Sequence, residues 1–284
     1  MQQPEDVNRG VLASVTEFLG GPHPDGEGWV FAFDEHLESN WGAVYGGALA
    51  AGALAVARCA APDRLPRSLH IQMIRSVPRG PAYATAEVRH AGRTVGTVVV
   101  DLHDARRKLA ATVLVTMVVP GAVAAQHHDT TAIPFRVATT PFETKTLFLA
   151  PVQQSLKMLR EVDGVYHRAF ADNVRPSVDG TPSPVGTITV PWDGLKYTGP
   201  EVSCLAADPM IAAAVLPTLI PREVVGPNPD LSLRFTTAPA TRVIQTSGTM
   251  LSVQHGTATI AIEVQAGDQL LAHGLGTSLF IPPK

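Results

Sequence analysis

The sequence has few of the features that mark secreted, nucleic-acid-binding or membrane proteins. Its 284 residues include two cysteines, Cys59 and Cys204, which are too few for a disulfide framework and lack the spacing of a zinc site. The 22 basic and 25 acidic residues leave a net charge of −3, so no broad basic surface for nucleic acid is expected. The first ten residues, MQQPEDVNRG, lack the basic and apolar regions of a secretory signal. No uncharged apolar run is hydrophobic enough to span a membrane.

These absences predict a cytoplasmic protein with buried, inert thiols. We expect no nucleic-acid partner, no membrane partner, no metal and no cofactor. The adjacent His127, His128 and Asp129 lack the spacing of metal ligands and are expected to be solvated. The sequence leaves a homo-oligomer open.

One stretch stands out by its composition. Residues 40–57, NWGAVYGGALAAGALAVA, contain no charged side chain and consist mainly of Ala and Gly. A surface helix normally has one apolar stripe and one polar face. This stretch is small and apolar on every side, so it predicts a helix from Gly46 to about Ala60 that is enclosed by other parts of the protein.

The residues after this helix read as strands. Alternating or β-branched runs at 68–77, 82–90, 93–104 and 108–119 favour antiparallel strands, and the last two are joined by a polar hairpin signal, HDARRK. Residues 121–134 read as a linker. A second Ala-rich helix is expected within 204–216, followed by strands within 230–238, 242–254, 257–265 and 269–281.

This order of segments is a repeat. Ser68 and Ser232 stand in similar strand sequences, Gly92 and Gly256 stand in similar turns, and both pairs are 164 residues apart. The two helices match at an offset of 160, which pairs Ala48 with Asp208. A period this long is too large for a solenoid. We therefore expect a first half at 1–120, a linker at 121–134, and a second half at 135–284 that pack together like a dimer.

The residues of both helices and the strands after them resemble one known family. A strongly twisted sheet can curl around a helix only if that helix is thin, and Ala and Gly make it thin. VYGGALAAGALAVARCAAPDRLPRSLHIQMIRSVPRG in the first half is similar to the acyl-CoA thioesterase II family, as are CLAADPM, PNPDLSLRF and GDQLLAHGLGTSLF in the second. The resemblance implies an α+β double hot-dog fold. Two antiparallel sheets, each wrapped around an Ala/Gly-rich helix, would join as a pseudo-dimer.

The resemblance also implies where the chemistry lies. Thioester hydrolysis needs a polarised carbonyl and an activated water, and the free N–H groups of a helix N-terminus can polarise the carbonyl. Gly46 and Gly47 would let a thioester carbonyl approach such a terminus, although they also permit tight packing of the helix. In the resembling family, the acid at the Asp208 position orients or deprotonates the water. An alternative role for Asp208 is an ordinary helix N-cap before Pro209.

Other site positions of the family are matched less well. Asn228 stands where the family has a hydroxyl residue that helps to hold the water, although it also fits an ordinary loop before Pro229. The family's third residue, a Gln on the last strand, is replaced by Gly276. His70 matches the family's Ser-x-His strand, although a hydrogen-bonded histidine near the core is favoured over a substrate-binding one. Trp41 fits the wall of an acyl pocket or aromatic packing over the helix entrance.

The predicted function is hydrolysis of an acyl thioester, carried by CoA or by a carrier protein, with water activated at Asp208. The alternative is a non-hydrolytic hot-dog protein that binds or cyclises an acyl or polyketide-like ligand in the same pocket. Arg106, Arg107 and Lys108 of the hairpin could meet CoA phosphates, although a charged turn is favoured.

Overall fold

The computed structural model describes residues 4–39, 42–122, 174–176, 182–189, 198–219, 227–236, 238 and 240–281. Within these ranges the chain forms three α-helices, one short 3-10 helix and twelve strands. Their bounds, in chain order, are α1 Pro4–Leu19, β1 His23–Asp25, β2 Gly28–Phe33, η1 Glu35–Leu37, α2 Gly46–Ala60, β3 Leu65–Met73, β4 Gly80–Ala91, β5 Val95–His103, β6 Leu109–Val118, β7 Val174–Pro176, β8 Pro182–Thr189, α5 Gly199–Leu219, β9 Asp230–Phe235, β10 Val243–Gln254, β11 Thr257–Ala266 and β12 Gln269–Leu279.

The strands form one antiparallel sheet instead of the two expected sheets. Its order is β1-β2-β4-β5-β6-β3-β9-β12-β11-β10-β8-β7, so the strands of the first half and of the second half meet where β3 pairs with β9. Each of these strands would otherwise leave an edge of unpaired N–H and C=O groups. Pairing the two edges satisfies these groups and joins the expected sheets into one.

The strand order is mirrored about this junction. Each strand of the first half has a counterpart at the same distance from the junction in the second half, from β3 and β9 at the centre to β1 and β7 at the edges. In the β3–β9 register Leu69 lies opposite Leu233, and these two residues are themselves 164 apart. The two leucines that face each other at the centre of the sheet are therefore separated by the same offset as the repeated segments of the sequence.

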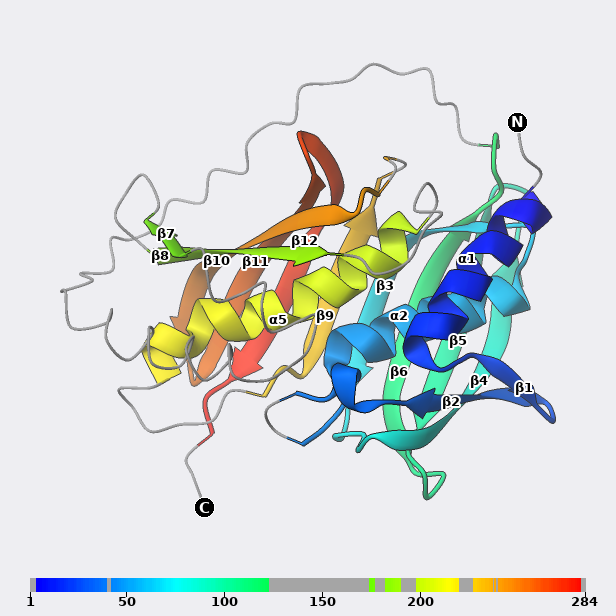
Figure 1. The fold of residues 1–284 in the computed structure, drawn as a ribbon, viewed down its shortest axis with the longest axis horizontal. Coiled ribbons are helices and arrows are strands. Elements are labelled where there is room, and N and C mark those ends of the chain that lie inside the picture. Colours follow the sequence, from blue (N-terminus) through cyan, green and yellow to red (C-terminus); the bar gives the residue numbers. More distant parts are fainter. Residues whose placement is uncertain are drawn as a thin grey trace.

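The helices cover one side of this sheet (Figure 1). Helix α2 contacts β3 to β6, helix α5 contacts β8 to β12, and the two helices pack against each other. Every residue of α2 from Gly46 to Arg58 is buried, which confirms that the small-residue helix is enclosed on all sides. At Gly52 an added Cβ would lie 3.2 Å from the Phe31 ring, so a larger side chain there would displace that ring.

Helix α1, which the sequence reasoning did not find, covers the outer side of α2 and part of β2. Its buried residues Val11, Val15 and Leu19 recur every four positions and form one apolar stripe. Asn8 from the same face donates a hydrogen bond to the carbonyl of Pro62, 2.5 Å away. Helix α1 therefore holds the end of α2 and the following turn.

The two cysteines differ in exposure. Cys204 is buried in α5, as expected, whereas Cys59 is only half-buried near the end of α2. Burial raises the pKa of both thiols; at Cys59 a hydrogen bond with Trp29 lowers it in part. Among the helices that the structure describes, none is both long and apolar enough to cross a membrane.

Candidate active site

Helix α2 begins at two buried glycines, as the sequence predicts. The residue before them, Tyr45, makes no side-chain capping hydrogen bond, and the first turn of the helix contains no acid. The first N–H groups of a helix have no partner within the helix, so they need one from elsewhere. At the start of α2 that partner comes from the other half of the chain.

Asp208 of α5 supplies this partner. Its carboxylate accepts hydrogen bonds from the backbone N–H groups of Gly47 and Gly46, and its side chain is 4% exposed. A Cβ added at Gly46 would lie 2.8 Å from Asp208 Oδ1 and 2.5 Å from the Met73 sulfur, so only glycine allows the carboxylate to come this close. At Gly47 an added Cβ would overlap the backbone oxygen of Cys204. The two glycines therefore serve the approach of α5 to the N-terminus of α2.

The alternative role of Asp208, as the N-cap of its own helix, is wrong. Helix α5 begins at Gly199, so Asp208 and Pro209 lie in its middle. Thr198 and Glu201 have the spacing of a capping box, and the residues up to Asp208 include good helix formers, so the helix starts earlier. Pro209 lacks the N–H that would bond the carbonyl of Leu205, yet the helix continues through it. Asp208 caps α2 instead.

Burial sets the charge properties of this site. Removal from water raises the pKa of Asp208, and hydrogen bonds from Asn228, Gly47 and Gly46 lower it in part, so that the net shift is upward. The phenol of Tyr45 also has a raised pKa, because it is desolvated and lies near the Asp208 charge. The carboxylate is therefore a stronger base than an exposed aspartate.

Asn228 completes the group of polar atoms around Asp208. It precedes β9, and its side-chain Nδ2 donates to Asp208 Oδ1 at 3.2 Å. Its own Oδ1 is buried and accepts no hydrogen bond from any described residue. Buried acceptors are normally satisfied by protein or by water. The structure thus places a free acceptor next to a buried carboxylate, as a water-holding pair requires.

The third family position has no polar side chain and no room for one. Gly276 on β12 faces helix α5, and an added Cβ would meet the side chain of Ile211, at 2.7 Å from its Cγ1, and that of Ile262 at 3.4 Å. Ile211 lies one helical turn beyond Asp208. The apolar side chain of Ile211 thus occupies the space through which a Gln at this position would reach the site.

Two other predicted site residues are not brought to this place. His70 lies exposed on β3 between buried neighbours Leu69 and Ile71, so it points to the sheet face opposite the helices. There its Nδ1 is hydrogen-bonded to the Ser232 hydroxyl at 2.6 Å. His70 is therefore hydrogen-bonded, as the favoured interpretation expects, but it lies on the exposed face of β3 and not near the core. Trp41 lies outside the described residues.

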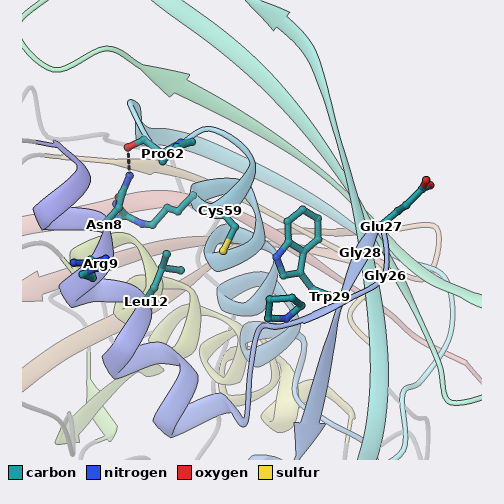
Figure 2. Close-up of a pocket in the computed structure, with 11 residues that line it drawn as sticks. Asn8, Arg9, Leu12, Gly26, Glu27, Gly28, Trp29, Cys59 and Pro62 are labelled. Atoms are coloured by element: carbon teal, nitrogen blue, oxygen red, sulfur yellow. Dashed lines mark hydrogen bonds between the residues drawn. The ribbon is translucent and has the colours of Figure 1, made fainter.

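A cavity of about 610 Å³ lies at the opposite end of α2 (Figure 2). Cys59 and Trp29 face it, together with residues of α1. The span from Gly46 to Cys59 is roughly 20 Å at the rise of an α-helix. Arg58 also lines the cavity, and its buried guanidinium pairs with Glu201 of α5 at 2.6 Å. This cavity therefore does not belong to the Asp208 site.

Within the described ranges, no group of three or more His, Cys, Asp or Glu side chains could hold a metal ion.

Comparisons with known proteins agree with this fold. Residues 37–119 match the family model described as acyl-CoA thioesterase N-terminal domain. The chain is similar to the solved tesB protein of Mycobacterium avium subspecies paratuberculosis, at 16% identity and a TM-score of 0.64, covering 95% of this chain and 100% of that one. It is also similar to the acyl-CoA thioesterase II TesB2 of Mycobacterium marinum, at 16% identity and a TM-score of 0.63, covering 95% and 99%.

The same fold also occurs in a protein with another activity. The dehydratase domain of RzxB from Pseudomonas fluorescens is 14% identical, with a TM-score of 0.58 over 92% of this chain and 98% of that one. No curated protein matches the chain. At these identities the solved structures establish the fold, whereas the family model establishes the resemblance of residues 37–119. The chain therefore has the hot-dog fold of the solved thioesterase II proteins, and its residues 37–119 are similar to an acyl-CoA thioesterase N-terminal domain.

Proposed function

We propose that the chain hydrolyses acyl thioesters with a water molecule activated by Asp208 and held by Asn228. The observation that carries this proposal is the buried Asp208 carboxylate at the N-terminus of α2, beside the unsatisfied Oδ1 of Asn228. The match of residues 37–119 to an acyl-CoA thioesterase domain supports the reaction class. The raised pKa of Asp208 suits a general base, because base strength rises with pKa as long as the group is ionised.

In the proposed reaction, water donates one hydrogen to the Asp208 carboxylate and the other to Asn228 Oδ1. The water oxygen bonds to the carbonyl carbon as its proton passes to Asp208. The tetrahedral oxyanion then collapses, the carbon–sulfur bond breaks, and the leaving sulfur takes the proton from Asp208. The products are a carboxylic acid and a free thiol, and the Asp208 carboxylate is regenerated.

The oxyanion would use the N–H groups of Gly46 and Gly47. In the free chain both bond the Asp208 carboxylate, so the substrate carbonyl must take the place of one carboxylate oxygen. This exchange would give the carbonyl a donor at the positive end of α2 and free a carboxylate oxygen to receive the water proton. The same two glycines would thereby hold the base in the free chain and stabilise the oxyanion during the reaction.

We also propose that the chain is a duplicated pseudo-dimer that keeps one of two symmetric sites. The mirrored strand order and the Leu69–Leu233 centre support two related halves, 1–120 and 135–284. At the site's counterpart, Ala48 stands in place of Asp208 and carries no carboxylate. In addition, α5 begins nine residues before Asp208, so the backbone that corresponds to Gly46 and Gly47 lies inside this helix and offers no free N-terminus to Ala48.

The proposal is tested by a screen of short, medium and long acyl-CoAs, with free thiol release as the readout. The same protein carrying Asp208→Asn serves as the blank, because it keeps the shape of the side chain and removes the base. Thiol release that depends on Asp208 would support hydrolysis. If the wild type released no thiol from any thioester, the proposal would be rejected.

A further inference from the structure

The sheet face opposite the helices, which we call the open face, carries exposed apolar side chains at its centre. In β6 and β12 the residues that alternate with the buried ones point to this face. Among them, Leu114 is 45% exposed and Leu275 is 46% exposed, so no described part of the chain covers either leucine. Single exposed leucines are common on protein surfaces, and their arrangement decides whether they form a binding surface.

The two leucines belong to one row of residues that crosses the six central strands. Leu114 lies opposite His70 in the pair of β6 and β3. His70 lies opposite Ser232, and Ser232 lies opposite Leu275. One further residue extends the line at each end, on β5 and on β11. We name these residues the central row: Val99, Leu114, His70, Ser232, Leu275 and Ala261. The row contains four apolar side chains and no Asp, Glu, Lys or Arg.

On β9, charged residues lie on both sides of the central row. Asp230 precedes Ser232 by two residues and Arg234 follows it by two, so all three side chains point to the open face. Arg234 is exposed, and its guanidinium donates a hydrogen bond to the carbonyl of Leu233 at 3.4 Å. Asp230 accepts a hydrogen bond from the hydroxyl of Thr277 at 2.6 Å. One cation and one anion therefore stand at equal distances on opposite sides of the row.

The open face is large enough for a stable protein interface. Strands β3 and β5 contain nine residues each. With a rise of about 3.3 Å per residue and about 4.8 Å between strands, six such strands form a face of roughly 850 Å². Two faces of this size would together bury roughly 1,700 Å², within the range of about 1,200–2,000 Å² for stable complexes. The cores of such interfaces are also poor in charged residues, as the central row is.

We propose that the open faces of two copies of this chain pack against each other as a symmetric dimer, with the two-fold axis along the central row. Rotation about this axis exchanges the two sides of the row, so Arg234 of each subunit meets Asp230 of the partner subunit. The leucines of the row meet the same row of the second copy, which removes them from water. The face complements itself in charge and in apolar character, so a second copy of the chain fits it.

This packing leaves the candidate site open. The helices, with Asp208 on α5, cover the other side of the sheet (Figure 1). Each subunit of the dimer would therefore keep its own site on an outer face. The contact uses no residue of the Asp208 site, so the dimer is independent of the proposed function. Sheets that pack face to face lie about 10 Å apart, which leaves room for one layer of side chains from each sheet.

Analytical ultracentrifugation of the wild type, from about 0.1 to 100 μM, should show a species of twice the 30.0 kDa of one chain. Leu114→Arg and Leu275→Arg each place like charges on the axis and should raise the Kd of the dimer about a hundredfold or more. Both positions are exposed in the single chain, so circular dichroism should show an unchanged fold. Val88→Arg is the matched control. Val88 is 41% exposed but lies opposite the inward-facing Val98, on the helix side of the sheet, so this change should leave the Kd unaltered.

An exchange of charges tests the position of the axis. Arg234→Asp and Asp230→Arg each bring like charges together at two places in the dimer and should raise its Kd about tenfold or more. The double variant restores opposite charges across the axis and should recover the dimer. It lacks the Thr277 hydrogen bond just as Asp230→Arg does, so recovery would come from the charges alone. A wild type that stays monomeric throughout, or a dimer that neither leucine variant weakens, would overturn the proposal. A double variant as weak as the single ones would overturn the assigned axis.

Discussion

Substitution of Asp208 by Asn tests the candidate site most directly. The carboxylate accepts hydrogen bonds from the N–H groups of Gly46 and Gly47 and from the Asn228 amide. An Asn side chain has one acceptor oxygen, and its NH2 group would face a donor. It keeps the shape of Asp but cannot take a proton from water. We expect turnover to fall by roughly 10²–10⁴-fold, the usual contribution of a general base.

Two opposing effects decide the stability of this variant. A buried N–H group left without an acceptor costs about 1–3 kcal/mol. Conversely, the amide removes a charge whose burial is unfavourable, as the raised pKa of Asp208 shows. Because the folded state holds the Asp208 proton more tightly than the unfolded state, the wild type loses stability as pH rises from about 4, the ordinary Asp value, to the raised folded value. The Asn variant lacks this loss.

The measurements are thiol release and urea unfolding of both proteins across this pH range. We expect the stability of the wild type relative to the variant to decrease as pH rises. Asp268→Asn, an exposed aspartate in the turn between β11 and β12, is the matched control and should change neither quantity. Full hydrolytic activity in a folded Asp208→Asn protein would leave Asp208 as a cap for α2 and refute the catalytic reasoning. If the free energies of unfolding of the wild type and of the Asp208→Asn variant changed with pH in the same way, the argument from the burial of Asp208 would be refuted.

Three further predictions concern packing and ionisation. Ala50→Leu and Ala51→Leu, both at fully buried positions of α2, should each destabilise the protein by about 1–3 kcal/mol, and unchanged melting temperatures in both would indicate a looser helix. Glu201→Ala removes the negative charge that faces the buried Arg58 guanidinium and should cost about 3–5 kcal/mol in urea unfolding, whereas adding Arg58→Met should recover much of that loss. In the pH profile of kcat/KM, the acidic limb should have an apparent pKa above the usual range for an aspartate, because the pKa of Asp208 is raised. An acidic limb with its midpoint at pH 4 or below would contradict this.

The parts of the fold governed by local pattern were predictable from sequence. Helix α2 spans Gly46–Ala60 as predicted. Its residues are small and apolar on every side, so a helix of this composition is stable only when it is buried on all sides. Strands β3 to β6 and β9 to β12 fall on the predicted runs, with ends that differ by a few residues. In these segments alternation of apolar and polar residues matches one covered and one open sheet face, so local sequence and tertiary structure agree.

Helix α1 and the true start of helix α5 were not predicted from the sequence. Helix α1 has an apolar stripe at Val11, Val15 and Leu19, which a search at helical spacing finds. The start of α5 is signalled by the spacing of Thr198 and Glu201, but Asp208 followed by Pro209 gives a competing signal for a later start. Tertiary contact decides between the two: Glu201 pairs with Arg58, which makes the first turn of α5 part of the contact with α2.

The candidate site shows why the sequence identified Asp208 as a candidate but did not reveal which helix it caps. A helix cap is expected from residues close in sequence, and for Asp208 the local sequence offers its own helix. The structure instead brings Asp208 to Gly46 and Gly47, more than 150 residues away, because α2 and α5 pack across the mirror relation of the two halves. No local rule contains this contact. Under the proposed duplication, a residue of one half would complete the helix terminus of the other, and Ala48, which has no carboxylate, would leave only the site at Asp208.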